Sequence, residues 1–257
     1  MEINPRAAAP VISARAAGEI ERSARADKFA VAITVTNLND SPIANPDSKT
    51  TAEDTQLTFA ASTLIANDLP GPANESTQTK TFVGVSSTSA NGGTVAVVVV
   101  NNVQNVRYTP PANFVGADTF TYTVRDNGSP QAVGTGTVTV TVTVSPKNDA
   151  PIGGQDNVTV QEDLALVISG ASLTANDAAG PANESGQTLT VTKVTKLINQ
   201  TPVASNTKGT VVLSGGNITY TPPVNYSGPD RFTYTATDNG TDGATAAPKS
   251  TVVTVLV

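Results

Sequence analysis

The sequence contains the same block of motifs twice, and this repetition constrains the fold more than any other feature. Four motifs of the first block return in the second at a constant offset of 109 residues (148 minus 39). They are Asn39-Asp40-Ser41-Pro42 with Asn148-Asp149-Ala150-Pro151, Glu53-Asp54 with Glu162-Asp163, Ala66-Asn67-Asp68 with Ala175-Asn176-Asp177, and GPANES at 71–76 with GPANES at 180–185. A chain of 257 residues can hold two domains of ordinary size, so we interpret the blocks as tandem domains.

A second set of motifs recurs at a slightly larger offset of 112 residues (220 minus 108). It consists of YTPP at 108–111 and 220–223, FTYT at 120–123 and 232–235, and DNG at 126–128 and 238–240. The change of offset indicates a loop of different length, as folds tolerate insertions between strands. We place the first repeat at residues 41–146 and the second at residues 147–257.

Residues 31–40, VAITVTNLND, are similar to residues 140–149, VTVTVSPKND, at the end of the first repeat. We therefore expect residues 1–40 to contain a leader followed by the last strand of a truncated preceding repeat. The leader, residues 1–28, has no continuous apolar segment followed by a cleavage site, so it is not a recognisable signal peptide. We predict no fold for it.

Alternating apolar and polar residues predict β-strands in the first repeat. The clearest case is TVTVTVTV at 137–144, in which Thr and Val point to opposite faces of a half-buried strand. Strands are expected near 47–50, 55–60, 78–86, 94–99, 103–109, 118–125 and 134–144. This count predicts an all-β, seven-stranded immunoglobulin-like Greek-key sandwich, without the Cys pair and Trp of antibody domains.

Finer features of the sandwich follow from the same strands. Phe120 and Tyr122 are two residues apart and should enter one face together, and Tyr122 and Tyr234 lie where a tyrosine corner would be. We expect a hairpin turn at Asn101-Asn102 and, in the second copy, at residues 213–216. The Thr/Val-rich run at 134–144 is expected to be an outer strand with which another chain could pair.

Composition removes several classes of function. The chain has no Cys and no His, which excludes disulfides, thiol nucleophiles, Ser-His-Asp catalysis and the usual zinc ligands. Its net charge of −6 disfavours nucleic acid as a partner. No run of about 20 apolar residues is present that could span a membrane. Acidic side chains held together in turns would instead suit a hard cation such as calcium.

The order of the motifs resembles a known family. An NDAP-type linker, a Glu-Asp pair, an AND turn, a YTP segment and a GxDxFTYT strand follow one another, as in the tandem cadherin-like repeats of large bacterial surface proteins. The resemblance runs from about Asn39 to Val257 and occurs twice. It implies an immunoglobulin- or cadherin-like sandwich, an extracellular or cell-surface location, a role in adhesion or spacing, and often calcium.

The turns of both repeats could provide the oxygen ligands that Ca²⁺ requires. In a sandwich, the loops after the second and sixth strands lie at the end where the preceding linker enters, so acidic segments should converge there. We predict a junction site of Glu53, Asp54, Asp118, Asn148, Asp149, Asp177 and Asp238, and an incomplete site of Asp40, Asp68 and Asp126 at the top of the first repeat.

A simpler explanation of these motifs stays open. Asn-Asp and Asp-Asn-Gly favour turns by themselves, because Asx side chains form hydrogen bonds with nearby backbone. Asp118 and Asp230 could likewise cap or hydrogen-bond a loop. The segment 125–130, RDNGSP, looks like a calcium-binding turn of animal cadherins, whereas its copy at 237–242, TDNGTD, lacks the Pro. Fewer carboxylates than in those cadherins imply fewer ions or weaker binding.

We therefore expect an extracellular structural or adhesive module that is stiffened by calcium at the junction between its repeats. Its partners would be neighbouring repeats and a homotypic or cell-surface partner. The alternatives are a metal-free spacer and a carbohydrate- or protein-binding module, although most aromatic residues recur at core positions. An enzyme is not expected, because the adjacent Glu53 and Asp54 would point to opposite faces of a strand and could not flank a glycosidic bond.

Overall fold

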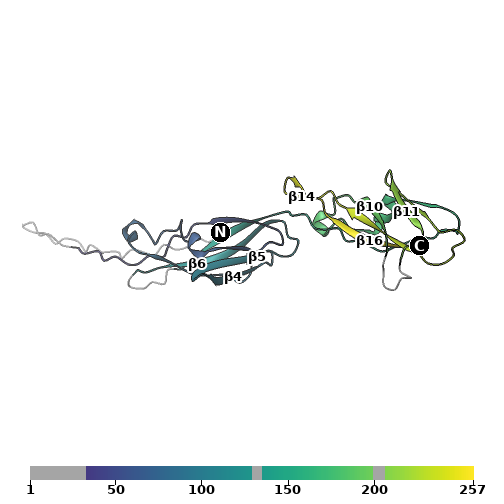
Figure 1. Cartoon of the computed structure of the whole chain (residues 1–257). Coiled ribbons are helices and arrows are strands. Elements are labelled where there is room, and N and C mark those ends of the chain that lie inside the picture. The colour runs from purple at the N-terminus through teal and green to yellow at the C-terminus, as the bar shows by residue number, and fades with distance from the viewer. Residues whose placement is uncertain (1–32, 129–134, 199–205) are drawn as a thin grey trace, which may run out of the picture. The chain divides into compact units, whose positions relative to one another are not determined.

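The computed structural model describes residues 33–128, 135–198 and 206–257 (Figure 1). Contacts divide the chain into two units, Met1–Asn37 and Leu38–Val257. The predicted leader at 1–28 lies outside the described residues. Residues 33–40 form no strand in the structure, although their alternation predicts one. Alternation does not supply a neighbouring strand, and a strand without one is not stable.

The first repeat is a sandwich of two sheets. Its strands are β1 (Asp47–Ala52), β2 (Leu57–Ala60), β3 (Lys80–Val85), β4 (Thr94–Val100), β5 (Val103–Thr109), β6 (Gly116–Asp126) and β7 (Thr135–Ser145), with the 3₁₀ turns η1 (Ala61–Thr63) and η2 (Ala73–Glu75). The sheets have the orders β1-β7-β6-β3 and β2-β5-β4. β1 runs parallel to β7, and the other pairs are antiparallel. The seven predicted strands are confirmed.

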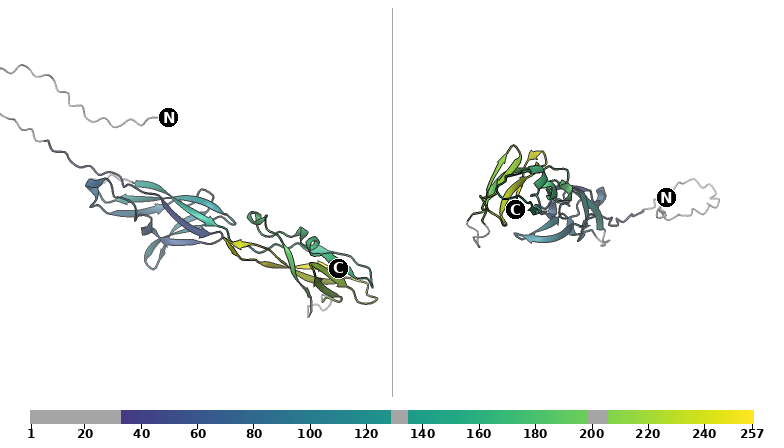
Figure 2. Two further views of the ribbon diagram at one scale, coloured as in Figure 1. Left: turned by 90° about the horizontal axis from the view of Figure 1, so that it is seen from above. Right: turned by 90° about the vertical axis from the view of Figure 1, so that its right-hand side faces the viewer.

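The second repeat has the same arrangement. Its strands are β8 (Asp156–Asn157), β9 (Leu166–Ser169), β10 (Thr190–Lys196), β11 (Thr210–Ser214), β12 (Asn217–Thr221), β13 (Arg231–Thr237) and β16 (Ser250–Leu256), with α1 (Gly170–Leu173), η3 (Thr174–Asn176) and η4 (Ala182–Glu184). The sheets have the orders β10-β13-β16-β8 and β11-β12-β9. A small hairpin of β14 (Thr241–Asp242) and β15 (Thr245–Ala246) is added after β13. Figure 2 shows that each repeat has its own sheets.

Each sandwich has a separate apolar core, because alternate residues of its strands face inward. Phe120 and Tyr122 are both buried, as predicted from their spacing. Tyr108 stacks on Phe120 with ring centroids 6.2 Å apart. The second core contains the equivalent stacked pair, Tyr220 and Phe232, at 6.0 Å. The aromatic residues at these repeated positions are therefore core residues.

Two predictions about the sandwich edges are corrected by the structure. β7 lies between β1 and β6, so the Thr/Val-rich run is a central strand and not an outer one. Asn101-Asn102 forms the predicted turn, with φ values of 49° and 63°. In the second copy the turn is Gly215-Gly216 alone, because residues 213 and 214 remain paired in β11.

The expected tyrosine corner is also absent from the described residues. The hydroxyl of Tyr122 lies 2.9 Å from the Asp68 carboxylate, and that of Tyr234 donates to Asp177 over 2.8 Å. A carboxylate is a stronger acceptor than a carbonyl oxygen. Each tyrosine therefore ties β6 or β13 to the segment after the second strand of its repeat, and not to backbone a few residues upstream.

Candidate metal centre

The parallel pairing of β1 with β7 brings two distant segments of the chain together. Ala52 pairs with Ser145 at the ends of these strands, and the backbone N–H of Glu53 donates to the Ser145 carbonyl oxygen over 2.9 Å. The chain that leaves β1 therefore runs beside the linker that leaves β7. This arrangement explains why a Glu-Asp pair of the first repeat meets an Asp of the linker.

Glu53, Asp54 and Asp149 form a compact acidic group, in which one oxygen from each side chain lies within 4.8 Å of the others. Glu53 is buried, Asp149 is partly buried and Asp54 is exposed. No second group of three acidic side chains that meets this condition occurs in the described ranges. Three carboxylates at this separation repel one another, and a cation between them would offset the repulsion.

Glu53 is held by both the linker and the second repeat. Its Oε1 accepts a hydrogen bond from the Lys147 N–H at 2.7 Å, and its Oε2 accepts one from Asn183 Nδ2 at 2.8 Å. The side chain is only 1% exposed. Asp54 adopts a φ of 52°, and its Oδ1 accepts from the Asn113 N–H at 3.0 Å. Both carboxylates are thus positioned by fixed backbone groups.

Glu184 adds a fourth carboxylate beside this group. Its Oε1 accepts from the Asp149 N–H at 2.9 Å, whereas its Oε2 is buried without a hydrogen-bond partner. Asp149 Oδ2 is buried without a partner as well. Burial raises the pKa of Glu184, and the charges of Asp149 and Glu53 raise it further against the hydrogen bond from Asp149. Buried oxygens without hydrogen-bond partners call for an explanation, and carboxylates crowded in this way are candidate ligands for a cation.

Asn148 and Asp238 form a buried pair next to this cluster. Asn148 Nδ2 donates to Asp238 Oδ1 over 2.9 Å, and Gln187 Nε2 donates to Asn148 Oδ1 over 2.8 Å. Asp238 Oδ2 has no partner, although the residue is only 4% exposed. The structure therefore places these two predicted residues at the top of the second repeat. The side-chain oxygen Oδ1 of Asn148 is therefore already engaged by Gln187.

Two predicted junction residues lie elsewhere. Asp118 is fully buried inside the first repeat, where it accepts hydrogen bonds from the Tyr108 hydroxyl at 2.7 Å and from the N–H groups of Asn91 and Thr119. Burial alone would raise its pKa, but these hydrogen bonds hold the pKa below its ordinary value. Asp177 accepts from the Gly154 N–H and the Tyr234 hydroxyl, so both of its oxygens are engaged. Neither residue belongs to the acidic group.

The predicted incomplete site at the top of the first repeat is only partly assembled. The Asp40 N–H donates to Glu75 Oε1 over 2.9 Å, and Asn39 Nδ2 donates to Asp126 Oδ1 over 2.9 Å. Glu75 Oε2 and Asp126 Oδ2 are buried without partners. Asp68 is bonded to the Tyr122 hydroxyl and does not join them. The arrangement repeats that of Asp149, Glu184, Asn148 and Asp238, without a Glu-Asp pair from a preceding repeat in the described residues.

Sequence reasoning missed Glu75 and Glu184, the buried acids of the GPANES motif. In the sequence, this motif serves only as a marker of repetition. A signal was present, because the glycine of each motif leaves room for the acid: a Cβ on Gly71 would lie 2.1 Å from Glu75 Oε2, and one on Gly180 would lie 1.8 Å from Glu184 Oε2. The sequence itself shows only that Gly and Glu recur at the same spacing in both copies, and the burial of the carboxylate is seen only in the structure.

A comparison with protein families decides the classification. The model of the bacterial Ig domain matches residues 39–144 and again residues 148–252. This chain belongs to the bacterial Ig domain family. The bacterial Ig chain thus contains two tandem immunoglobulin- or cadherin-like domains, as its motifs predicted. No curated protein matches its sequence.

Several solved structures are similar to this chain at low sequence identity. The extracellular domain of protocadherin GammaB4 is 15% identical with a TM-score of 0.38, covering 85% of this chain and 35% of that one. Mouse cadherin-23 EC22-24 is 19% identical with a TM-score of 0.43, covering 84% and 66%. An endo-fucoidan hydrolase of glycoside hydrolase family 107 is 13% identical with a TM-score of 0.29, covering 86% and 29%.

The family has coarse consequences for location and chemistry. Bacterial Ig domains are typically extracellular or at the cell surface, and their family and fold are typically non-enzymatic. Among the described residues, no helix is long and apolar enough to cross a membrane. A tandem arrangement is consistent with a structural or adhesive role in which each domain contacts its neighbours.

Proposed function

We propose that the bacterial Ig chain is an extracellular structural or adhesive repeat module whose junction between repeats binds calcium. The observation that carries this proposal is the convergence of Glu53, Asp54 and Asp149 within 4.8 Å. Glu53 and Asp54 lie in the turn that follows β1, Asp149 lies in the linker, and Glu184 of the second repeat lies beside them. A cation at this place would contact every segment that meets at the junction.

The donor set fits calcium better than a transition metal. The group offers only oxygen atoms, and Ca²⁺ takes six to eight oxygen ligands at about 2.3–2.6 Å in a flexible geometry. Glu53, Asp54, Asp149 and Glu184 would supply carboxylate oxygens, and water would complete the shell through the exposed side of Asp54. The unpartnered oxygens of Asp149 and Glu184 are available for this role.

Calcium would act by stiffening the linker. Without an ion, the first repeat is connected to the linker and the second repeat through the hydrogen bonds that Glu53 accepts from Lys147 and Asn183. Each such bond contributes on the order of 1–3 kcal/mol and can be replaced by water. An ion that is coordinated by both repeats must lose several ligands before the repeats can move. The module would then be a stiff spacer when calcium is present.

Catalysis is not part of the proposed function. The Glu-Asp pair that invites a glycosidase interpretation lies at the junction, where Glu53 accepts hydrogen bonds from the linker and from the second repeat. Its carboxylate is 1% exposed, which leaves no space for a sugar between two carboxyl groups. The position of this pair therefore suits binding of a cation and does not suit general acid and base catalysis of glycoside hydrolysis.

Direct calcium binding to the whole chain tests this proposal. We expect isothermal titration with CaCl₂ to give a saturable site that Asp149→Asn and Asp54→Asn each weaken at least tenfold. The matched control is Asp163→Asn, because Asp163 has the same motif, a similar φ of 64° and an equivalent hydrogen bond from the Asn225 N–H at 2.8 Å. Equal loss in the control would show that calcium binding does not depend on this junction, and no binding to the parent would show a metal-free spacer whose acidic motifs are turns.

A further inference from the structure

The two repeats differ at one position that holds a positive charge. In the first repeat, the ammonium group of Lys80 donates to the carbonyl oxygens of Ile65 at 2.7 Å and of Asp68 at 2.5 Å. These carbonyls follow η1, and Lys80 opens β3 on the opposite side of the loop. The ammonium group of Lys80 therefore ties the start of β3 to the segment that follows η1.

The second repeat has the same backbone positions without the lysine. At the common offset, Ile65, Asp68 and Lys80 correspond to Thr174, Asp177 and Leu189. Leucine has no donor, so nothing at this position replaces the ammonium group. The Thr174 carbonyl accepts a hydrogen bond from the Asp177 N–H at 3.3 Å, but a carbonyl oxygen has a second lone pair.

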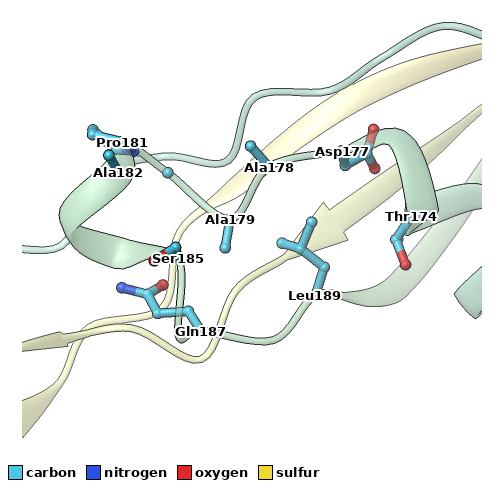
Figure 3. A pocket seen from close by; sticks show the side chains of 10 residues that line it. Thr174, Asp177, Ala178, Ala179, Pro181, Ala182, Ser185, Gln187 and Leu189 are labelled. Carbon is cyan, nitrogen blue, oxygen red and sulfur yellow. The ribbon is translucent and has the colours of Figure 1, made fainter.

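A hollow of about 410 Å³ lies at this place in the second repeat (Figure 3). It is lined by Thr174, Asp177 and Leu189 together with the loop that contains Ala178 and Ala179. The first repeat has the larger Leu69 and Pro70 at the two alanine positions. In the second repeat this place therefore lacks the lysine stem and the larger side chains of the first repeat.

The walls of the hollow combine apolar surface with oxygen acceptors. Figure 3 shows Ala179 and Leu189 facing each other, with Ser185 and Gln187 at one end and Thr174 at the other. Gln187 Oε1 is buried without a partner. The lining contains Asp177 and no Lys or Arg. Such a surface suits an alkyl chain that ends in a donor-rich positive group.

We propose that this hollow of the second repeat binds a primary ammonium group on an alkyl chain, either a lysine side chain of another protein or a free alkylamine. The ammonium would donate to the carbonyl oxygens of Thr174 and Asp177, as Lys80 does to their counterparts. Its stem would pack on Leu189 and Ala179. The inference goes beyond calcium binding, since the ligand and the residues are different.

Titration of the whole chain with n-butylammonium, followed by backbone amide NMR, tests the proposal. We expect saturable shifts at Ala178, Ala179 and Gly180, and much smaller shifts with tetramethylammonium, which has no N–H donor. Leu189→Met should bind within threefold of the parent. Leu189→Lys should weaken binding at least tenfold, because its own ammonium would occupy the carbonyls in the manner of Lys80.

A second variant and a peptide ligand complete this experiment. If Leu189→Lys does not fold, Ala179→Leu should fill the hollow and weaken n-butylammonium by a similar factor. A blocked Gly-Lys-Gly peptide, compared with its acetyl-lysine form, distinguishes a protein side chain from a small amine as the source. Equal shifts with tetramethylammonium, or unchanged n-butylammonium affinity in both Leu189→Lys and Ala179→Leu, would overturn the proposal.

Discussion

The Glu-Asp pairs of the two repeats have the same sequence but different surroundings. Glu53 is 1% exposed and accepts hydrogen bonds from Lys147 and Asn183, whereas Glu162 is exposed. The aspartates are alike: Asp54 and Asp163 both have positive φ and both accept from a backbone N–H. The motif therefore forms the same turn twice, and only the copy that meets a following linker and repeat becomes part of an acidic group.

The Tyr-Asp pairs of the two repeats behave differently, because they do not depend on a neighbour. Tyr108 donates to Asp118 over 2.7 Å, and Tyr220 donates to Asp230 over 2.6 Å. In both pairs, hydrogen bonds to the carboxylate lower the pKa of the Asp against the effect of burial. A motif whose partners lie within one repeat thus has a structural role, whereas the glutamate of the Glu-Asp motif finds its partners only where a linker and a second repeat meet it.

The largest loss of stability is expected from substitutions that break the Tyr-Asp pair of each repeat. Asp118→Asn and Asp230→Asn should each lower the free energy of unfolding by about 3 kcal/mol, because buried hydrogen bonds to a charged acceptor are lost. Urea unfolding at neutral pH measures the loss. Asp163→Asn, at an exposed turn, is the control. A loss in only one repeat would contradict the claim that the pairs are equivalent.

A somewhat smaller effect is expected at the glycine beside Asn148. A Cβ on Gly240 would lie 1.6 Å from Asn148 Oδ1, so Gly240→Ala should displace the buried Asn148–Asp238 pair and cost about 2 kcal/mol. At Gly186, where a Cβ would meet nothing within 4 Å, alanine should be nearly neutral. Thermal unfolding compares the two variants. Equal melting temperatures would show that the Asn148 contact does not restrain the top of the repeat.

The crowding at the junction predicts a smaller, pH-dependent effect on stability. The pKa of Glu184 is raised in the folded chain, so the folded chain holds the proton of Glu184 more tightly than the unfolded chain does. This stabilises the folded chain fully below the unfolded pKa. The stabilisation is lost as pH rises through the folded pKa. In calcium-free buffer, Glu184→Gln should match the parent at low pH and become more stable than the parent as pH rises.

Chemical unfolding between pH 4 and pH 8 measures this difference, with Glu162→Gln as the matched control because Glu162 is exposed. The same gain in both variants would mean that general charge repulsion, and not the junction, causes the effect. If Glu184→Gln instead became more stable than the parent as pH falls, the pKa of Glu184 would not be raised in the folded chain.

The smallest expected effect concerns the hairpins that distinguish the repeats. β4 and β5 have seven residues each, whereas β11 and β12 have five. The longer hairpin leaves Val99 68% exposed, while Val95 on the same strand is 4% exposed. Val99→Thr should therefore change the unfolding free energy by less than about 0.5 kcal/mol, and Val95→Thr by about 2 kcal/mol. Comparable losses in urea unfolding would show that the hairpin tip is covered.

The strands can be predicted because alternation is a local property of the sequence. The strands that pair with them cannot be predicted in this way, because pairing joins distant parts of the chain. The TVTVTVTV pattern predicts a strand, but it cannot tell a central position from an outer one. The similar alternation at 33–40 forms no strand in the described residues. Among site residues, Glu53, Asp54 and Asp149 were predicted and are brought together. Asp118 was misplaced and Glu184 was missed, because hydrogen-bond partners and burial depend on contacts between distant loops.

The central claim is that a calcium ion joins the two repeats through the group of Glu53, Asp54 and Asp149. Its most direct test is thermal unfolding of the whole chain with and without millimolar CaCl₂, with MgCl₂ as the control for ionic strength and Asp149→Asn beside the parent. An ion bound only by the folded chain should add about 2.7 kcal/mol at a hundredfold excess over its dissociation constant. If the junction binds calcium, the melting temperature of the parent should rise with CaCl₂ alone and Asp149→Asn should remove the rise. An unchanged melting curve in the parent would show that no calcium ion joins the repeats.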